Sequence, residues 1–100
     1  MDTLRQTLRD ELLGYAGEAL NGYSYLTSSA DGQFFAVVSI GHVRGQRIVE
    51  ADLVVRVAGD RVIVERDIND KPLVDALVAA GVPRGQIVLA YAGESAADAA

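Results

Sequence analysis

One stretch in the middle of the chain constrains the fold more than any other. Arg47–Gly59 (RIVEADLVVRVAG) alternates with a period of two. Its odd-numbered side would carry Val49, Ala51, Leu53, Val55 and Val57, and its even-numbered side Ile48, Glu50, Asp52, Val54 and Arg56. Such alternation is typical of a strand with one buried and one largely solvated face in an antiparallel sheet. We therefore expect a long strand here, with the odd-numbered side facing the core.

The flanking residues predict two neighbouring strands. Ala58–Arg61 can close a hairpin, after which Val62–Asp67 (VIVERD) forms the returning strand. Phe34–Gly41 (FFAVVSIG) is rich in β-branched and aromatic residues and predicts the preceding strand. Tyr23–Gln33 is expected to be a loop or a weak edge strand. The three strands in order would form an antiparallel meander.

The N-terminal residues predict a helix. Thr3 and Gln6 have the spacing of a capping box, in which each side chain satisfies a backbone N–H at a helix start. Apolar residues then recur every four positions, and Asn21–Gly22 is expected to end the helix. The recurring residues are Leu4, Leu8, Leu12, Ala16 and Leu20.

A shorter helix is predicted after residue 70. Asp70 is a suitable N-cap, Pro72 suits the first turn, and Gly81 and Pro83 end the helix. Gln86–Tyr91 (QIVLAY) then predicts a fourth strand, whose open edge would invite a partner. We thus expect a two-layer α+β domain over residues 1–93, in the order α-β-β-β-α-β, followed by a flexible tail over residues 94–100.

Composition excludes several classes of protein. The chain has 100 residues, no cysteine and a net charge of −5, so it lacks a disulfide framework and the basic excess of a free-standing DNA-binding protein. We find no signal peptide and no membrane span, and expect a cytoplasmic protein. Five arginines at 44, 47, 56, 61 and 66 alternate with acidic residues, which favours an ion-paired, solvated sheet face over a nucleic-acid surface.

The sequence predicts no catalytic, cofactor or metal site. His42 is the only histidine, and no nucleophile pattern accompanies it. Asp52, Glu65 and Asp67 are similar to the acidic residues of a metal-dependent nuclease, but the expected lysine position holds Asp67. Ion pairing with the nearby arginines explains Asp52 better. A small metal-dependent nuclease and a weak DNA-binding regulator therefore remain alternatives.

From Met1 to about Gly93, and most clearly from Val62 onward, the chain resembles the XisI-like proteins, the controlling factors of fdxN-element excision in cyanobacteria. The matching features are Arg66–Asp67 after a strand, a helix ending in Ala80–Gly81–Val82–Pro83, and the strand Ile87–Leu89. The family's glycine, basic pair and long alternating strand also have counterparts upstream. The chain departs from the family at His42, where a tryptophan is usual. It departs again after Tyr91, where a His-Pro-Pro turn and a longer tail are usual.

The resemblance implies an accessory protein for programmed DNA excision that is not itself an enzyme and binds a XisH-like nuclease partner. It implies no cofactor, and DNA contact only weakly or within a complex. A homodimer is also plausible, because pairing would protect an exposed strand. The residues that we expect to contact a partner are His42, Arg44, Arg47, Arg66, Asp67 and Tyr91.

Overall fold

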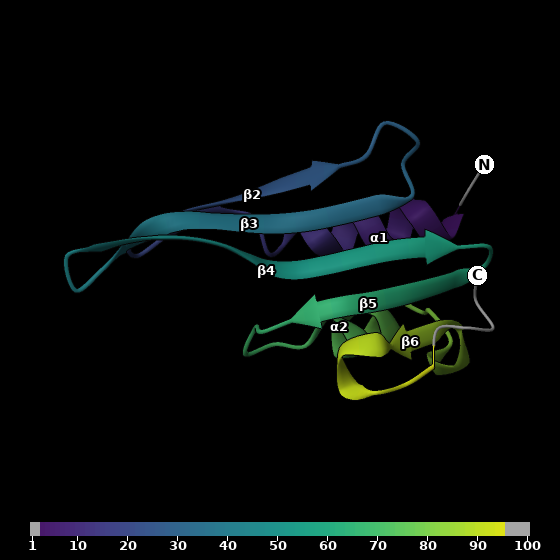
Figure 1. Ribbon diagram of the computed structural model, residues 1–100. Helices are drawn as coiled ribbons and strands as arrows, with labels where there is room; N and C mark the ends of the chain where they lie inside the picture. Colours follow the sequence, from purple (N-terminus) through teal and green to yellow (C-terminus); the bar gives the residue numbers. More distant parts are fainter. Residues whose placement is uncertain (1–2, 96–100) are drawn as a thin grey trace.

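A single sheet of six strands, ordered β1 to β6 as in the sequence, forms the centre of the structure (Figure 1). The computed structural model describes residues 3–95. Neighbouring strands are antiparallel from β1 to β5, and β6 runs parallel to β5. The strands are β1 (Gly17–Ala19), β2 (Gly22–Ser28), β3 (Phe34–Val43), β4 (Gln46–Ala58), β5 (Arg61–Asp67) and β6 (Ile87–Leu89).

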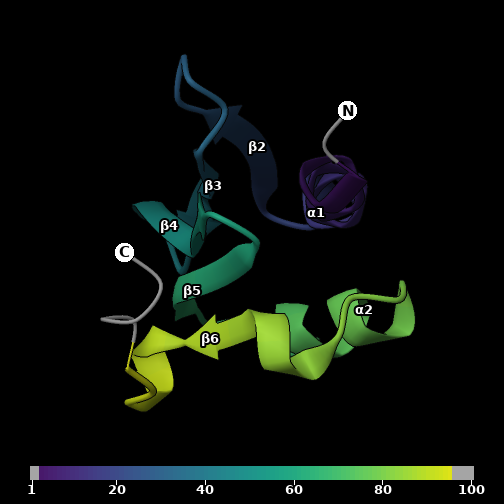
Figure 2. The same ribbon diagram turned by 90° about the vertical axis from the view of Figure 1, so that its right-hand side faces the viewer.

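Two α-helices, α1 (Thr3–Leu13) and α2 (Leu73–Ala79), lie on the same side of the sheet (Figure 2). We call this side the helix face and the other side the open face. Two short 3₁₀ helices, η1 (Arg84–Gln86) and η2 (Ala90–Ala92), flank β6. The main core lies between the helices and the sheet, and its largest fully buried side chains are Phe35, Leu8, Leu12, Leu53, Leu73 and Leu77. The predicted two-layer α+β class, the β3–β4–β5 meander and the final helix and strand are confirmed.

The N-terminal helix is shorter than the sequence predicted. It ends at Leu13, and Leu20, which the apolar periodicity placed on the buried stripe, is 98% exposed. The first 3₁₀-type bond after the helix runs from Gly14 N to Glu11 O at 3.1 Å, and Gly17 adopts a φ of 119°. Glycine in these positions favours leaving the helix over continuing it. The prediction that Asn21–Gly22 ends the helix was therefore wrong.

Residues after the helix form β1 and β2, and β1 was not predicted. Leu20 and Asn21 make the turn between them, since Ala19 pairs with Gly22. The segment expected to be a loop or a weak edge strand is instead the seven-residue strand β2, which lies between β1 and β3. Gly22 pairs with Gly41 of β3, and a Cβ atom on Gly22 would lie 2.0 Å from the Ile40 carbonyl oxygen. Only glycine allows this close approach of the two backbones.

A β-bulge in β4 reverses the predicted inside–outside pattern. Val37 pairs with Leu53 and the next residue, Val38, pairs with Ala51, so Asp52 is the extra residue. An extra residue shifts the period-two alternation by one. Leu53, Val55 and Val57 face the core as predicted, but Val49 and Ala51 lie on the open face, where the sequence pattern did not place them.

The start of α2 also differs from prediction. Pro72 occupies the N-cap position without a capping side chain, and Asp70 makes no capping bond. Asp67 at the end of β5 replaces it, because its Oδ2 accepts a hydrogen bond from Leu73 N at 2.7 Å. A carboxylate bound to a first-turn N–H stabilises a helix start as an N-cap does.

The predicted C-terminal tail lies largely outside the described residues. Glu94 and Ser95 are described, and residues 96–100 are not. Across residues 3–95, the helices are all too short or too polar to traverse a bilayer.

Candidate binding surface

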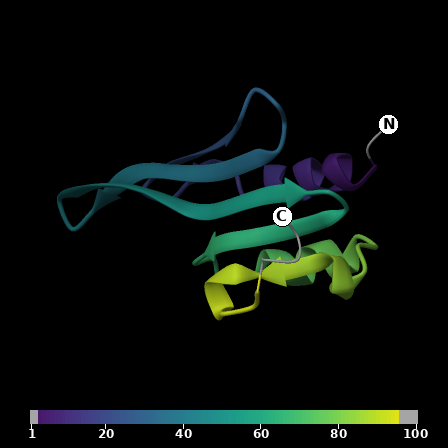
Figure 3. The same cartoon turned by 45° about the vertical axis from the view of Figure 1, so that its right-hand side comes forward.

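The β3–β4 hairpin extends well beyond the helices and β5 (Figure 3). β4 has 13 residues but pairs with β5 only from Leu53 to Ala58. We call residues 39–52, the part of the hairpin beyond this pairing, the arm. β2 covers one side of the arm, where it pairs with β3 as far as Gly41. The other side, formed by β4, has no neighbouring strand among the described residues.

The arm ends in a tight two-residue turn. Val43 pairs with Gln46, and the intervening Arg44 and Gly45 both have positive φ, 54° and 76°. Two positive φ angles in a two-residue loop define a type I′ turn, which matches the twist of the flanking strands. Arg44 is the only non-glycine residue with positive φ among the described residues.

Three of the expected partner-contacting residues gather at the end of the arm. Arg47 pairs with His42 across the hairpin, and Arg44 is in the turn between them. All three side chains are exposed. The end of the arm is thus a small, solvent-facing cationic site.

The other expected contact residues lie elsewhere and make internal bonds. Arg66 Nε donates to the carbonyl oxygen of Ala51 at 2.7 Å, and its Nη2 lies 3.2 Å from Glu50. Asp67 accepts from Asn69 N at 3.0 Å, and also holds the first residue of α2. Arg66 therefore fills the position where β5 diverges from β4, and Asp67 fixes α2.

Tyr91, the sixth expected contact, lies in η2, directly after β6. Partial burial raises the pKa of Tyr91 above 10.0, and the charges of Asp67, Asp75 and Glu94 raise it further. Its hydroxyl is thus uncharged at neutral pH. The structure does not join Tyr91 to the end of the arm in one site.

The arm presents apolar side chains on the open face. Residues paired across an antiparallel sheet share a face, so the registers define two rows. One row is Tyr23, Ile40 and Val49, and the other is Tyr25, Val38 and Ala51. Tyr23, Tyr25 and Val49 are exposed, and the two tyrosine rings contact each other with centroids 4.7 Å apart. We call these two rows the apolar rows.

The edge that the sequence suggested for a partner, β6, is closed by its own neighbours. Leu89 N donates to Glu94 Oε1 at 2.9 Å, and Glu94 N donates to Leu89 O at 3.1 Å. Arg84 donates to Ile87 O at 2.7 Å and pairs with Glu94 at 3.0 Å. We call these contacts of Arg84 and Glu94 the clasp. They occupy backbone groups at both ends of β6. Since a β-strand partner needs those groups, β6 is a poor place for one.

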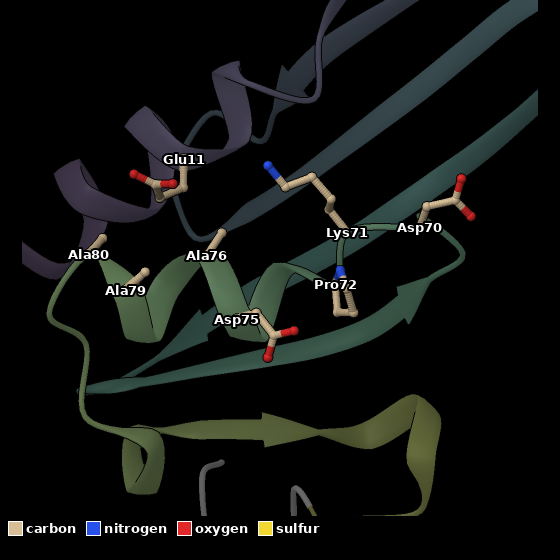
Figure 4. A pocket seen from close by; sticks show the side chains of 8 residues that line it. All are labelled: Glu11, Asp70, Lys71, Pro72, Asp75, Ala76, Ala79 and Ala80. Atoms are coloured by element: carbon tan, nitrogen blue, oxygen red, sulfur yellow. The ribbon is translucent and has the colours of Figure 1, made fainter.

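A groove lies between α1 and the start of α2 (Figure 4). Alanines of α2 form its floor, and Glu11, Asp70, Lys71 and Asp75 surround it. Tyr15 closes one side of this region by donating to Lys71 O at 2.8 Å. The groove is acidic and open, and sequence reasoning missed it because its residues come from two distant helices.

The three carboxylates of the nuclease alternative do not converge. Glu65 lies 2.8 Å from Arg56 in an ion pair, whereas Asp52 accepts a hydrogen bond from Ser39 and Asp67 binds the start of α2. Among residues 3–95, no group of three acidic, histidine or cysteine side chains is arranged to hold a metal ion.

The five arginines proposed as a DNA surface are also dispersed. Arg56 and Arg66 are ion-paired to Glu65 and Glu50, as the alternating charges predicted. Arg44 and Arg47 are at one end of β4, and Arg61 follows its other end. They form no continuous basic surface.

Comparison with known proteins identifies the family. The model of the XisI protein family matches residues 3–99. The chain belongs to the XisI family. Comparison with curated protein sequences gives no match.

Two solved structures share the XisI fold. A XisI-like protein from Anabaena variabilis is 17% identical, with a TM-score of 0.65, over 86% of this chain and 78% of that one. The fdxN element excision controlling factor XisI from Anabaena variabilis is also 17% identical, with a TM-score of 0.66, over 87% of this chain and 88% of that one. At this identity the likeness concerns the fold. The resemblance found in the sequence is thus confirmed at the level of family and fold.

Proposed function

We propose that this protein is a non-enzymatic accessory factor for the excision of a DNA element and that it acts by binding another protein. The observation that carries the proposal is the family match over residues 3–99, together with a structural neighbour named as an excision controlling factor. The bonding of the polar side chains supports it, because Asp67, Arg66 and Glu65 are engaged in internal contacts.

The partner that we propose is a XisH-like protein of the nuclease class, as the family resemblance implies. The apolar rows of the arm provide a suitable surface, because exposed aromatic groups beside β-branched residues are typical of protein interfaces. The arginines at the end of the arm would lie at the rim of that surface. Any DNA contact would arise within the complex, since a net charge of −5 opposes binding of the free protein to a polyanion.

Co-purification tests this proposal. The chain would be co-expressed with a XisH-like protein, and the affinity of the purified pair measured by calorimetry. Tyr25→Ser should weaken binding at least about tenfold, because truncating a central interface tyrosine costs about 2 kcal/mol or more. Val78→Ser, which removes an exposed apolar side chain from α2, is the matched control and should leave affinity unchanged.

Two outcomes would contradict the proposal. One is failure of the two proteins to associate at micromolar concentration. The other is hydrolysis of DNA by the purified chain alone with Mg²⁺ or Mn²⁺, abolished by Asp52→Asn; this result would favour the nuclease alternative.

A further inference from the structure

The outer edge of β4 in the arm carries unpaired backbone groups whose direction can be derived. In an antiparallel ladder, both backbone groups of one residue point to the same side, and successive residues alternate. The Ala51 carbonyl oxygen points away from β3, because Arg66 binds it from the β5 side. His42 N bonds to Asn21 O at 3.0 Å on the β2 side, so its partner Arg47 also points away from the β3–β4 ladder.

Both observations show that the odd-numbered residues of this segment point their backbone groups away from β3. Arg47, Val49 and Ala51 direct their N–H and C=O groups outward, and Ile48 and Glu50 direct theirs toward β3. Within residues 3–95, no hydrogen bond reaches the outward groups of Arg47 or Val49. A strand edge of this kind binds another extended strand.

We propose that this edge pairs with the same edge of a second copy of the chain, antiparallel and with Ile48 on the two-fold axis. Arg47 of each copy then lies opposite Val49 of the other, and the two residues exchange both of their backbone hydrogen bonds. In this register the outward N–H and C=O groups of Arg47 and Val49 all have hydrogen-bond partners in both copies. Neither proline nor lysine, the usual protections of an edge, occurs in Gln46–Ala51.

The side chains fit this register. On the open face, Val49 is 56% exposed and would be covered by the aliphatic stem of Arg47 from the second copy. On the helix face the two Ile48 side chains meet, and Gln46 faces Glu50 of the second copy as an amide donor to a carboxylate. No like charges lie directly opposite each other, as cross-strand pairing requires.

A register centred on Val49 fits less well. It would place Arg47 against Ala51 of the second copy, whose carbonyl oxygen already accepts from Arg66. The guanidinium of Arg66 would then face Arg47, and two positive charges would repel each other. The bonding of Arg66 thus selects Ile48 as the centre.

The proposal predicts a weak homodimer, because the contact is small compared with the area of stable interfaces. We expect a dissociation constant on the order of 100 μM. It does not rest on the proposed function, because a symmetric pair of this chain needs neither a XisH-like partner nor DNA. Measurements on the purified chain alone therefore keep the two proposals separate.

Opposite charges at position 49 test the register. Sedimentation equilibrium at protein concentrations up to about 1 mM gives the dissociation constant of the homodimer. Val49→Lys places a positive charge opposite Arg47 twice per dimer and should weaken association about tenfold, whereas Val49→Glu should strengthen it about tenfold. The matched controls Val78→Lys and Val78→Glu, at a site on α2 that is 45% exposed, should change it less than about twofold.

Cross-linking tests the axis. The chain has no cysteine, so Ile48→Cys introduces the only thiol. Directly opposite, non-hydrogen-bonded residues have Cα atoms about 4.5 Å apart, within disulfide range. In Val49→Cys the two Cα atoms would be about 8 Å apart, beyond that range. Mild oxidation by diamide should therefore join the Ile48→Cys chains quickly and the Val49→Cys chains at least about tenfold more slowly.

Three results would each overturn the proposal. The first is that the unmodified chain remains monomeric at the highest protein concentration measured. The second is a shift of the dissociation constant in the same direction for both charges at position 49. The third is equal rates of cross-linking at positions 48 and 49 in variants that keep the melting temperature of the unmodified chain.

Discussion

Replacing Gly22 by alanine would place a methyl group against the backbone of β3. The new Cβ would lie 2.0 Å from the Ile40 carbonyl oxygen and 2.6 Å from Gly41 Cα, and real Cβ atoms essentially never approach closer than 3.0 Å. The two strands must therefore separate by about 1 Å at this point, the difference between 3.0 Å and 2.0 Å. The obstacle is backbone, so rotation of a side chain cannot relieve it.

The separation would break hydrogen bonds that attach β1 and β2 to the sheet. The bond from His42 N to Asn21 O, now 3.0 Å, would lengthen to about 4 Å, beyond hydrogen-bond range. Losing this bond and an adjacent ladder bond, together with the residual strain, should cost about 2–4 kcal/mol of unfolding free energy. In a domain of this size the melting temperature should fall by roughly 10–20 °C.

Thermal and urea unfolding followed by circular dichroism measure the effect, with Gly85→Ala as the control. No heavy atom lies within 4 Å of a Cβ at Gly85, and this residue does not have positive φ. The control should be neutral or gain up to about 1 kcal/mol from reduced freedom of the unfolded chain. If the two variants unfolded within about 2 °C of each other, the close contact between β2 and β3 would be refuted.

Three further substitutions test local interactions. Asp67→Ala should lower the unfolding free energy by about 1–3 kcal/mol in urea titrations, because it leaves the first N–H of α2 without an acceptor, whereas Asp70→Ala should change it by less than about 0.5 kcal/mol. Arg44→Asn should raise it by about 0.5–1 kcal/mol, since asparagine tolerates the φ of 54° better than arginine does; an unchanged urea midpoint would argue against the type I′ turn. Hydrogen bonds from the backbone of β6 and then from Arg84 hold the pKa of Glu94 below 4.5, so its stabilising contribution is present above that pH and is lost as the pH falls through the lowered pKa. The melting temperature of Glu94→Gln should therefore lie below that of the unmodified chain at neutral pH and converge with it in acid, and a constant difference would be inconsistent with the clasp.

The elements with the strongest sequence signals were predicted correctly. The alternation in Arg47–Gly59 identified the longest strand, and the turn at Ala58–Arg61 placed its neighbour. The end of α1 was missed because the spacing of Ala16 and Leu20 continues the helical period. Instead, the chain leaves the helix at Gly17, which has positive φ, and then pairs with β3, where Gly22 lies against Gly41. Such long-range contacts leave no local pattern.

The faces of β4 show a second limit. Alternation alone cannot reveal an extra residue, because Val49 and Ala51 are apolar and suit either face of the sheet. Only the pairing of Val37 with Leu53 and of Val38 with Ala51 shows the bulge. Among the six residues that the sequence predicted to contact a partner, Arg66 and Asp67 also make internal hydrogen bonds. These bonds depend on how the strands and α2 are placed, so the sequence pattern could not show them.

The single surplus residue at Asp52 places odd-numbered residues of β4 on different faces on its two sides, because Leu53 faces the core whereas Ala51 and Val49 face away from the helices. The faces of the arm are set by β3, whose own register with β2 is unbroken, so Ala51 lies opposite Val38 and Val49 lies opposite Ile40. Deleting Asp52 would make Ala51 and Leu53 sequence neighbours on opposite faces, which is where the bulge already holds them. Relatives with and without this residue would therefore present the same outer surface over an unchanged buried centre, and would differ only in the local bend of the strand.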